Sequence, residues 1–193
     1  MRMWWQALLS SFGLMFVAEL GDKTQIVILT LSAKHGFKRV FLGAAAAFTI
    51  LNVLAVSIGV LVYELIPETA LKYAVSAIFI VFGILALLPR KEKTEEEEEE
   101  EEGKLKRRHG PMITAFLLVC LMELGDKTQL SLVALTAKYS QPVFVFAGGT
   151  LALWATSLIG ALVGTFLGKS IPRVWIHRAS GVIFIAFGII NLF

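Results

Sequence analysis

One heptapeptide occurs twice in this chain: residues 19–25 and residues 123–129 both read Glu-Leu-Gly-Asp-Lys-Thr-Gln. Each copy places two carboxylates, an ammonium group, a hydroxyl and an amide inside an apolar run that is long enough to cross a membrane. Unpaired charge at such a depth is strongly unfavourable, so ionisable residues there mark functional sites by default. The two copies therefore decide how the whole chain is interpreted.

The composition is that of an integral membrane protein. Of the 193 residues, 56% are hydrophobic and 17% are charged, and the mean hydropathy is +0.74, which leaves too little polar surface to cover a soluble domain. The net charge of +3 does not indicate a nucleic-acid partner, because the basic residues lie in short segments between apolar runs. Cys120 is the only cysteine, which excludes an intrachain disulfide and a cysteine-based metal cluster.

Six apolar runs predict six transmembrane helices. They cover residues 3–33, 40–63, 71–88, 112–137, 143–167 and 174–193. The first run would reach about 46 Å as one helix at 1.5 Å per residue, against about 30 Å of hydrocarbon. It must tilt, protrude or break, and Gly21 is the natural place for a break.

A charged segment separates two halves of the chain. Residues 90–110 contain basic residues on both sides of an unbroken acidic run, Glu95 to Glu102. Like charges repel one another and bury nothing, so this segment is predicted to be a solvated linker, although an acidic run could also gather or sense cations. The predicted organisation is a first three-helix repeat at 1–89, the linker at 90–110 and a second three-helix repeat at 111–193.

The two halves align beyond the heptapeptide. An offset of 104 relates the heptapeptides, and after one inserted residue an offset of 105 brings Gly43 onto Gly148 and Gly59 onto Gly164. Because three spans is an odd number, a linker that does not cross the membrane leaves the second unit inverted relative to the first. Inverted repeats with a site at their interface are a recurrent plan of transporters.

The distribution of Lys and Arg predicts the orientation in the membrane. The side that holds the linker carries most of them, and the opposite side has only Arg2, Lys72 and Lys138. By the positive-inside rule, the linker is cytoplasmic and both termini are outside. The expected location is the cell membrane, as a multi-pass protein.

The heptapeptides are rich in oxygen ligands. On one continuous helix, Glu19 and Asp22 would share a face, and the second copy would offer the same groups from the other half. The predicted metal ligands are Glu19, Asp22, Thr24, Gln25, Glu123, Asp126, Thr128 and Gln129. Such an all-oxygen set suits Mg²⁺, Ca²⁺ or Mn²⁺ better than Zn²⁺ or Cu²⁺.

Two lysines within the copies are predicted to balance charge. Lys23 and Lys127 are each expected to pair with the glutamate four residues earlier or with the neighbouring aspartate of the same copy. With every group ionised, four carboxylates and two ammonium groups leave a charge of −2, which one dication neutralises. Protons would compete with the metal for the same oxygens, so an exchange of metal for protons follows naturally. For a single copy taken alone, the alternative to a metal site is a cluster of buried ion pairs and hydrogen bonds with a purely structural role.

The duplicated Glu-x-Gly-Asp-Lys-Thr motif, the six spans and the charged central loop resemble the GDT family of cation/proton exchangers. The resemblance implies that Glu19, Asp22, Glu123 and Asp126 bind the cation, and that Mn²⁺, or else Ca²⁺, moves in exchange for H⁺. It further implies a transporter, not an enzyme, that exports Mn²⁺ from the cytoplasm and uses no cofactor besides the transported ion. Its partners would be the divalent ion, protons and the lipid bilayer, with a homo-oligomer left open.

Two other classes of function fit part of the pattern. Two Gly-Asp pairs in separate spans could form the dyad of an intramembrane aspartyl protease, although flanking lysines would keep both aspartates ionised. An uncoupled cation channel or a metal-sensing accessory subunit would also need the acidic residues. Coupling of metal movement to protons separates these alternatives from an exchanger.

Overall fold

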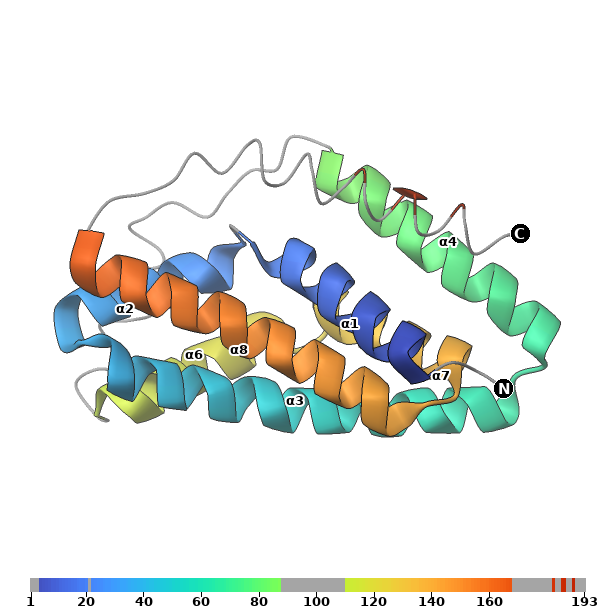
Figure 1. Ribbon diagram of the computed structural model, residues 1–193, viewed down its shortest axis with the longest axis horizontal. Coiled ribbons are helices and arrows are strands. Elements are labelled where there is room, and N and C mark those ends of the chain that lie inside the picture. The colour runs from blue at the N-terminus through green and yellow to red at the C-terminus, as the bar shows by residue number, and fades with distance from the viewer. Residues whose placement is uncertain are drawn as a thin grey trace.

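The computed structural model describes residues 4–20, 22–87 and 110–167, together with the single residues 182, 185, 186 and 189. This part of the chain is helical and contains no strand (Figure 1). The helices are α1 (Trp4–Glu19), α2 (Lys23–His35), α3 (Phe37–Leu65), α4 (Glu68–Leu87), α6 (Pro111–Glu123), α7 (Lys127–Tyr139) and α8 (Pro142–Leu167). Most of the predicted linker, including its acidic run, and most of the predicted last span lie outside the described residues.

Two long helices, α3 and α8, lie at the centre of the helix packing. Helix α3 has 29 residues and α8 has 26, so they extend about 44 and 39 Å at 1.5 Å per residue. Within the described residues, these two helices are long and apolar enough to cross a membrane. They pack against each other and cover the second and fifth predicted spans (Figure 1).

The first and fourth predicted spans are each two helices and not one. Helix α1 ends at Glu19 and α2 begins at Lys23, while α6 ends at Glu123 and α7 begins at Lys127. The break in the overlong first run is confirmed at the heptapeptide. The break in the second copy was not expected from length. Gly125 has φ +78°, a conformation that side chains with a Cβ atom rarely adopt, so glycine suits this turn.

The two halves contact each other in an equivalent way. Helices α1 and α2 pack on α8, and their counterparts α6 and α7 pack on α3. Four glycines lie so close to backbone carbonyls of the opposite half that a Cβ atom would collide: Gly43 at Met112, Gly148 at Leu8, Gly59 at Val133 and Gly164 at Leu29. Both the glycines and their partners correspond under the sequence alignment of the halves. Each close approach of a glycine in the first half to the second half therefore has an equivalent, in which the corresponding glycine of the second half approaches the first half.

Candidate functional site

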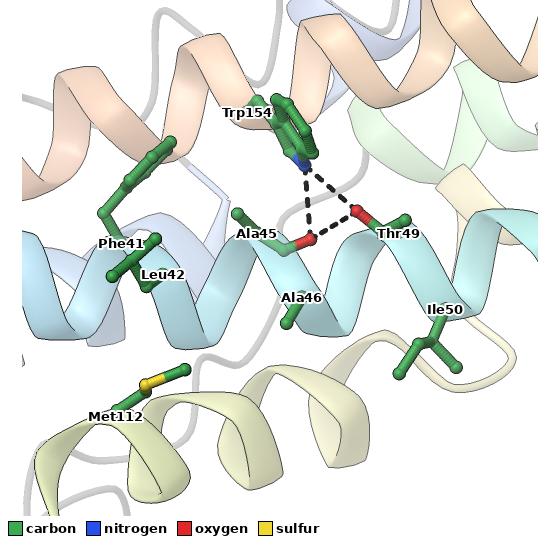
Figure 2. A pocket seen from close by; sticks show the side chains of 8 residues that line it. All are labelled: Phe41, Leu42, Ala45, Ala46, Thr49, Ile50, Met112 and Trp154. Carbon is green, nitrogen blue, oxygen red and sulfur yellow. Dashed lines mark hydrogen bonds between the residues drawn. The ribbon is translucent and has the colours of Figure 1, made fainter.

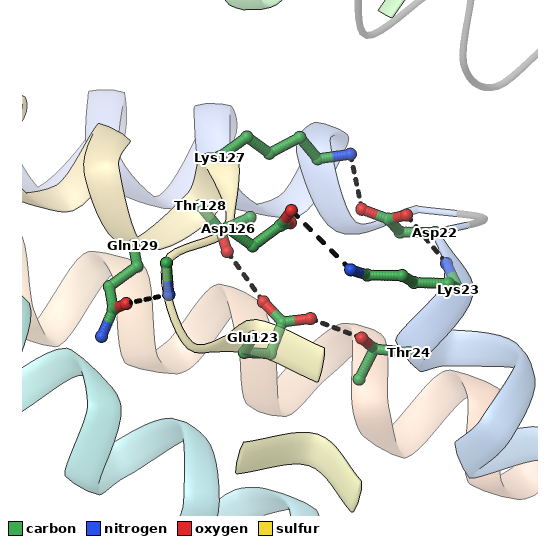
Figure 3. Close-up of polar contacts among 9 residues, drawn as sticks. Asp22, Lys23, Thr24, Glu123, Asp126, Lys127, Thr128 and Gln129 are labelled. Carbon is green, nitrogen blue, oxygen red and sulfur yellow. Dashed lines mark hydrogen bonds and ion pairs between the residues drawn. The ribbon is translucent and has the colours of Figure 1, made fainter. Parts of the chain in front are cut away.

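The two heptapeptides lie at the α1–α2 and α6–α7 breaks, and their side chains meet in the interior (Figure 3). Thr24, the second residue of α2, donates its hydroxyl to Oε1 of Glu123 at the end of α6. Ion pairs also join the two copies directly. The two copies thus face each other, and the side chains of Asp22, Lys23 and Thr24 contact those of Lys127, Asp126 and Glu123, respectively.

Each lysine pairs with the aspartate of the opposite copy. Lys127 Nζ lies 2.5 Å from Asp22 Oδ2, and Lys23 Nζ lies 3.9 Å from Asp126 Oδ1 (Figure 3). The predicted pairing within one copy is therefore wrong. The helix break is the physical reason, because it removes the i to i+4 relation that the prediction assumed.

The helix break also changes the role of Asp22. We expected Glu19 and Asp22 to share one helix face, but Glu19 ends α1 and Asp22 is the N-cap of α2. Oδ1 of Asp22 accepts the backbone N–H of Lys23 at 2.8 Å. Asp126 holds the N-cap position of α7 without a side-chain cap hydrogen bond. Both aspartates thus lie at helix N-termini, where the helix dipole favours negative charge.

Glu123 is held by two hydroxyl groups. Its Oε1 accepts from Thr24 and its Oε2 accepts from Thr128 at 2.9 Å. All three side chains are buried, with at most 2% of their surface exposed. The two hydrogen bonds hold the Glu123 carboxyl group in position.

Glu19 has the corresponding position in the first copy but different surroundings. It is 2% exposed, and neither of its carboxylate oxygens has a hydrogen-bond partner. Buried polar groups are almost always hydrogen-bonded, so an exception of this kind needs an explanation such as an ion or a functional role. Glu19 therefore has two oxygens available for a ligand.

The two predicted glutamine ligands make local contacts. Gln129 Oε1 accepts the backbone N–H of Gly125 at 2.7 Å and so closes its own turn. Gln25 Nε2 donates to the backbone carbonyl of Thr156 on α8 at 3.5 Å. Gly160 on α8 leaves the space for the Gln25 side chain. Nothing in the sequence indicates this contact between Gln25 and α8.

The cluster is a set of acidic groups whose charge is partly neutralised by lysines. No three carboxylate, imidazole or thiol groups in the described residues lie in a metal-ligating arrangement. Instead, each lysine pairs with one aspartate oxygen. A divalent cation that binds Asp22 or Asp126 would compete with the lysine that pairs with that aspartate.

A separate pocket of about 530 Å³ lies among α3, α6 and α8 (Figure 2). Its lining is almost entirely apolar and contains no charged residue: Phe41, Leu42, Ala45, Ala46, Thr49, Ile50, Met112 and Trp154. The indole N–H of Trp154 donates to the Ala45 carbonyl and to the Thr49 hydroxyl, both at 3.2 Å. With its few polar atoms engaged, this pocket offers no ligands to a cation.

The fold and the site together define a class of protein. Long apolar helices place a buried cluster of carboxylates, hydroxyls and ammonium groups at the meeting point of two equivalent halves. This combination is typical of helical membrane proteins that move ions, in which interrupted helices carry the binding groups.

Comparison with known proteins identifies the family. The family model described as "Divalent cation/proton antiporter GDT1" matches residues 7–94 and 111–193. The chain belongs to this family, which consists of membrane transporters and not of enzymes. The resemblance inferred from the duplicated motif is thereby confirmed. No solved structure shows significant similarity to this chain.

Several curated relatives match more than 90% of this chain. A GDT1-like protein of Synechocystis is 28% identical over 92% of this chain and 92% of its own length. "Protein PAM71, chloroplastic" of Arabidopsis thaliana is 30% identical over 95% of this chain and 55% of its own length. A Vibrio cholerae protein named "Putative manganese exporter" is 26% identical over 92% of this chain and 86% of its own length.

Proposed function

We propose that this protein exchanges Mn²⁺, and with lower preference Ca²⁺, for protons, and that it exports Mn²⁺ from the cytoplasm. The observation that carries the proposal is the convergence of both heptapeptides on one buried cluster, through the Thr24–Glu123 hydrogen bond and the two crossed ion pairs. The name of the Vibrio cholerae relative supports manganese and the direction of export.

The proposed ligands are the four carboxylates Glu19, Asp22, Glu123 and Asp126, with the hydroxyls of Thr24 and Thr128 and the amides of Gln25 and Gln129. Hard oxygen ligands suit Mn²⁺, Ca²⁺ and Mg²⁺. The charge of −2 that remains after the two lysines are counted is neutralised by one dication or by protons. This shared demand for positive charge couples the two ions.

The proposed architecture is a pair of inverted three-helix repeats with six spans. The equivalent close approaches of the halves support this arrangement. In this topology, both termini are outside and the linker is cytoplasmic. The cluster then lies where one repeat can move against the other around a fixed site.

The crossed ion pairs weaken the case for an intramembrane aspartyl protease. An aspartic dyad works with two carboxylates that share one proton. Here each aspartate forms an ion pair with a lysine of the opposite copy, Asp22 with Lys127 and Asp126 with Lys23.

Transport by purified protein in liposomes tests the proposal. With a pH gradient imposed, we expect Mn²⁺ uptake together with a change in internal pH, which a trapped dye reports, and Ca²⁺ and Mg²⁺ are measured in parallel. Glu123→Gln should abolish both signals, whereas Glu64→Gln, at an exposed position near the end of α3, should retain them. Mn²⁺ uptake that never moves protons, or full activity of Glu123→Gln, would reject the exchanger.

A further inference from the structure

The two heptapeptides are identical in sequence but not in their environment. The Lys127–Asp22 pair is short at 2.5 Å, and its side chains are 12% and 3% exposed. The Lys23–Asp126 pair is longer at 3.9 Å, and Lys23 is 38% exposed. One ion pair is therefore closed and buried, while its counterpart is loose and more accessible.

Other pairs of corresponding residues show the same difference. Glu123 accepts two threonine hydroxyls, whereas Glu19 has no hydrogen-bond partner. Leu124 is 70% exposed, whereas the corresponding Leu20 is partly buried. The asymmetry is thus a property of the whole site and not of a single side chain.

Because the two heptapeptides are identical and the halves pack in an equivalent way, either ion pair could be the short, buried one. The close approaches of Gly43 and Gly148 to the opposite half are made at corresponding positions. An arrangement in which Lys23–Asp126 is short and Lys127–Asp22 is loose would thus contain the same chemical pairs. One protein can populate two arrangements that contain the same chemical pairs, and differential interactions then shift the population between them.

We propose that the two crossed ion pairs alternate as a lock, each closing one side of the site while the other opens. Lys127 is the closed member in the present arrangement, and Lys23 takes that role in the alternate one. Each lysine acts as a tethered cation that holds an aspartate until a transported ion replaces it. This inference rests on the proposed exchanger and specifies how its site is gated.

The tethered lysines and the transported ion compete because they neutralise the same carboxylates. A dication that enters beside Asp126 meets the looser pair first, since Lys23 is the more exposed lysine. Asp22 becomes available only when Lys127 withdraws. Lysine thus keeps the site from remaining strongly negative while the repeats change their arrangement, which an empty four-carboxylate site would resist.

The labelling rates of single cysteines report which ion pair is closed, and they can be measured without any metal. In a Cys120→Ser background, Leu20→Cys and Leu124→Cys are introduced singly, and each protein in nanodiscs is labelled with a small charged thiosulfonate. We expect Leu124→Cys to react faster than Leu20→Cys. Lys127→Gln should lower this ratio of rates by about tenfold, because loss of one closed pair shifts the equilibrium toward the alternate arrangement. Lys23→Gln should raise the ratio.

Opposite shifts are the result that a general structural role of the lysines cannot produce. Equal shifts in the same direction, or no shift with either variant, would overturn the proposal. Lys23 is partly exposed, so Lys23→Gln provides a folded variant even if Lys127→Gln does not fold, and an unchanged ratio in Lys23→Gln alone is sufficient to reject the lock. Lys127→Arg should restore the parental ratio.

The outcome is distinct from that of the transport assay. Opposite shifts in labelling without proton-coupled Mn²⁺ uptake would reject the proposed exchanger and keep the lock. Coupled uptake with a ratio that neither lysine variant changes would reject the lock and keep the exchanger.

Discussion

The hydroxyl of Thr24 donates a hydrogen bond to the carboxyl group of Glu123 and so joins α2 to the other half of the chain. Thr24 is 0% exposed, and valine has nearly its shape. Thr24→Val therefore removes one hydrogen bond to Glu123, which is ionised when it binds Mn²⁺ in the proposed site, and leaves Glu123 with the bond from Thr128. Hydrogen bonds to charged groups contribute about 1.5–3 kcal/mol, which corresponds to about 10- to 150-fold in affinity.

We expect this loss to appear in the apparent affinity for Mn²⁺, measured as the concentration dependence of uptake in proteoliposomes. The reason is that Thr24 positions Glu123 for the ion. Thr24→Ser keeps the hydroxyl and should remain within about threefold of the parent protein, in line with the scatter of such substitutions. Ser57→Ala removes an exposed hydroxyl of α3 that donates to the Val53 carbonyl of its own helix and should have no effect.

An affinity of Thr24→Val equal to that of the parent protein would refute this reasoning, provided that both proteins elute as single species of the same size. The hydrogen bond would then contribute to packing only. A loss in Thr24→Ser as large as that in Thr24→Val would place the effect in the shape of the side chain and not in its hydroxyl.

Three further predictions concern packing and the turn. Gly148→Ala should lower the free energy of unfolding by about 1–3 kcal/mol, and with it the melting temperature, because its Cβ would collide with the α1 backbone. Gly13→Ala is the control, because its Cβ would meet open space, and it should leave the melting temperature unchanged. Gln129→Leu loses the bond to the Gly125 N–H and should weaken Mn²⁺ uptake while the helix content measured by circular dichroism stays unchanged; normal uptake would contradict a role of this turn. Trp154→Phe loses two hydrogen bonds outside the site and should lower thermal stability but leave the Mn²⁺ affinity intact, which a shift in affinity would contradict.

The sequence predicted the broad fold because the relevant signals are local. Apolar runs are sufficient to place the long helices α3 and α8, and the excess length of the first run indicated its break at the heptapeptide. The fourth run, residues 112–137, is short enough to be one helix, so only the identity of the heptapeptides could have indicated its break. Length and motif are thus separate signals, and the motif was the more informative one.

The pairing of charges could not be predicted from sequence in the same way. Whether Lys127 reaches Glu123, Asp126 or Asp22 depends on how the two breaks face each other, which is a tertiary property. The difference between Glu19 and Glu123 is even less accessible, because identical heptapeptides contain no information about which copy is closed. The sequence thus indicated which heptapeptides carry the ionisable groups but not which lysine pairs with which aspartate.

The central claim is that both heptapeptides form one cation site. Equilibrium binding of Mn²⁺ to the purified protein, measured by isothermal titration calorimetry, tests it most directly. We predict one ion per chain, and we predict that either Asp22→Asn or Asp126→Asn alone removes most of the binding. Two ions per chain, or half of the sites surviving each substitution, would show that the copies bind independently and would contradict the claim.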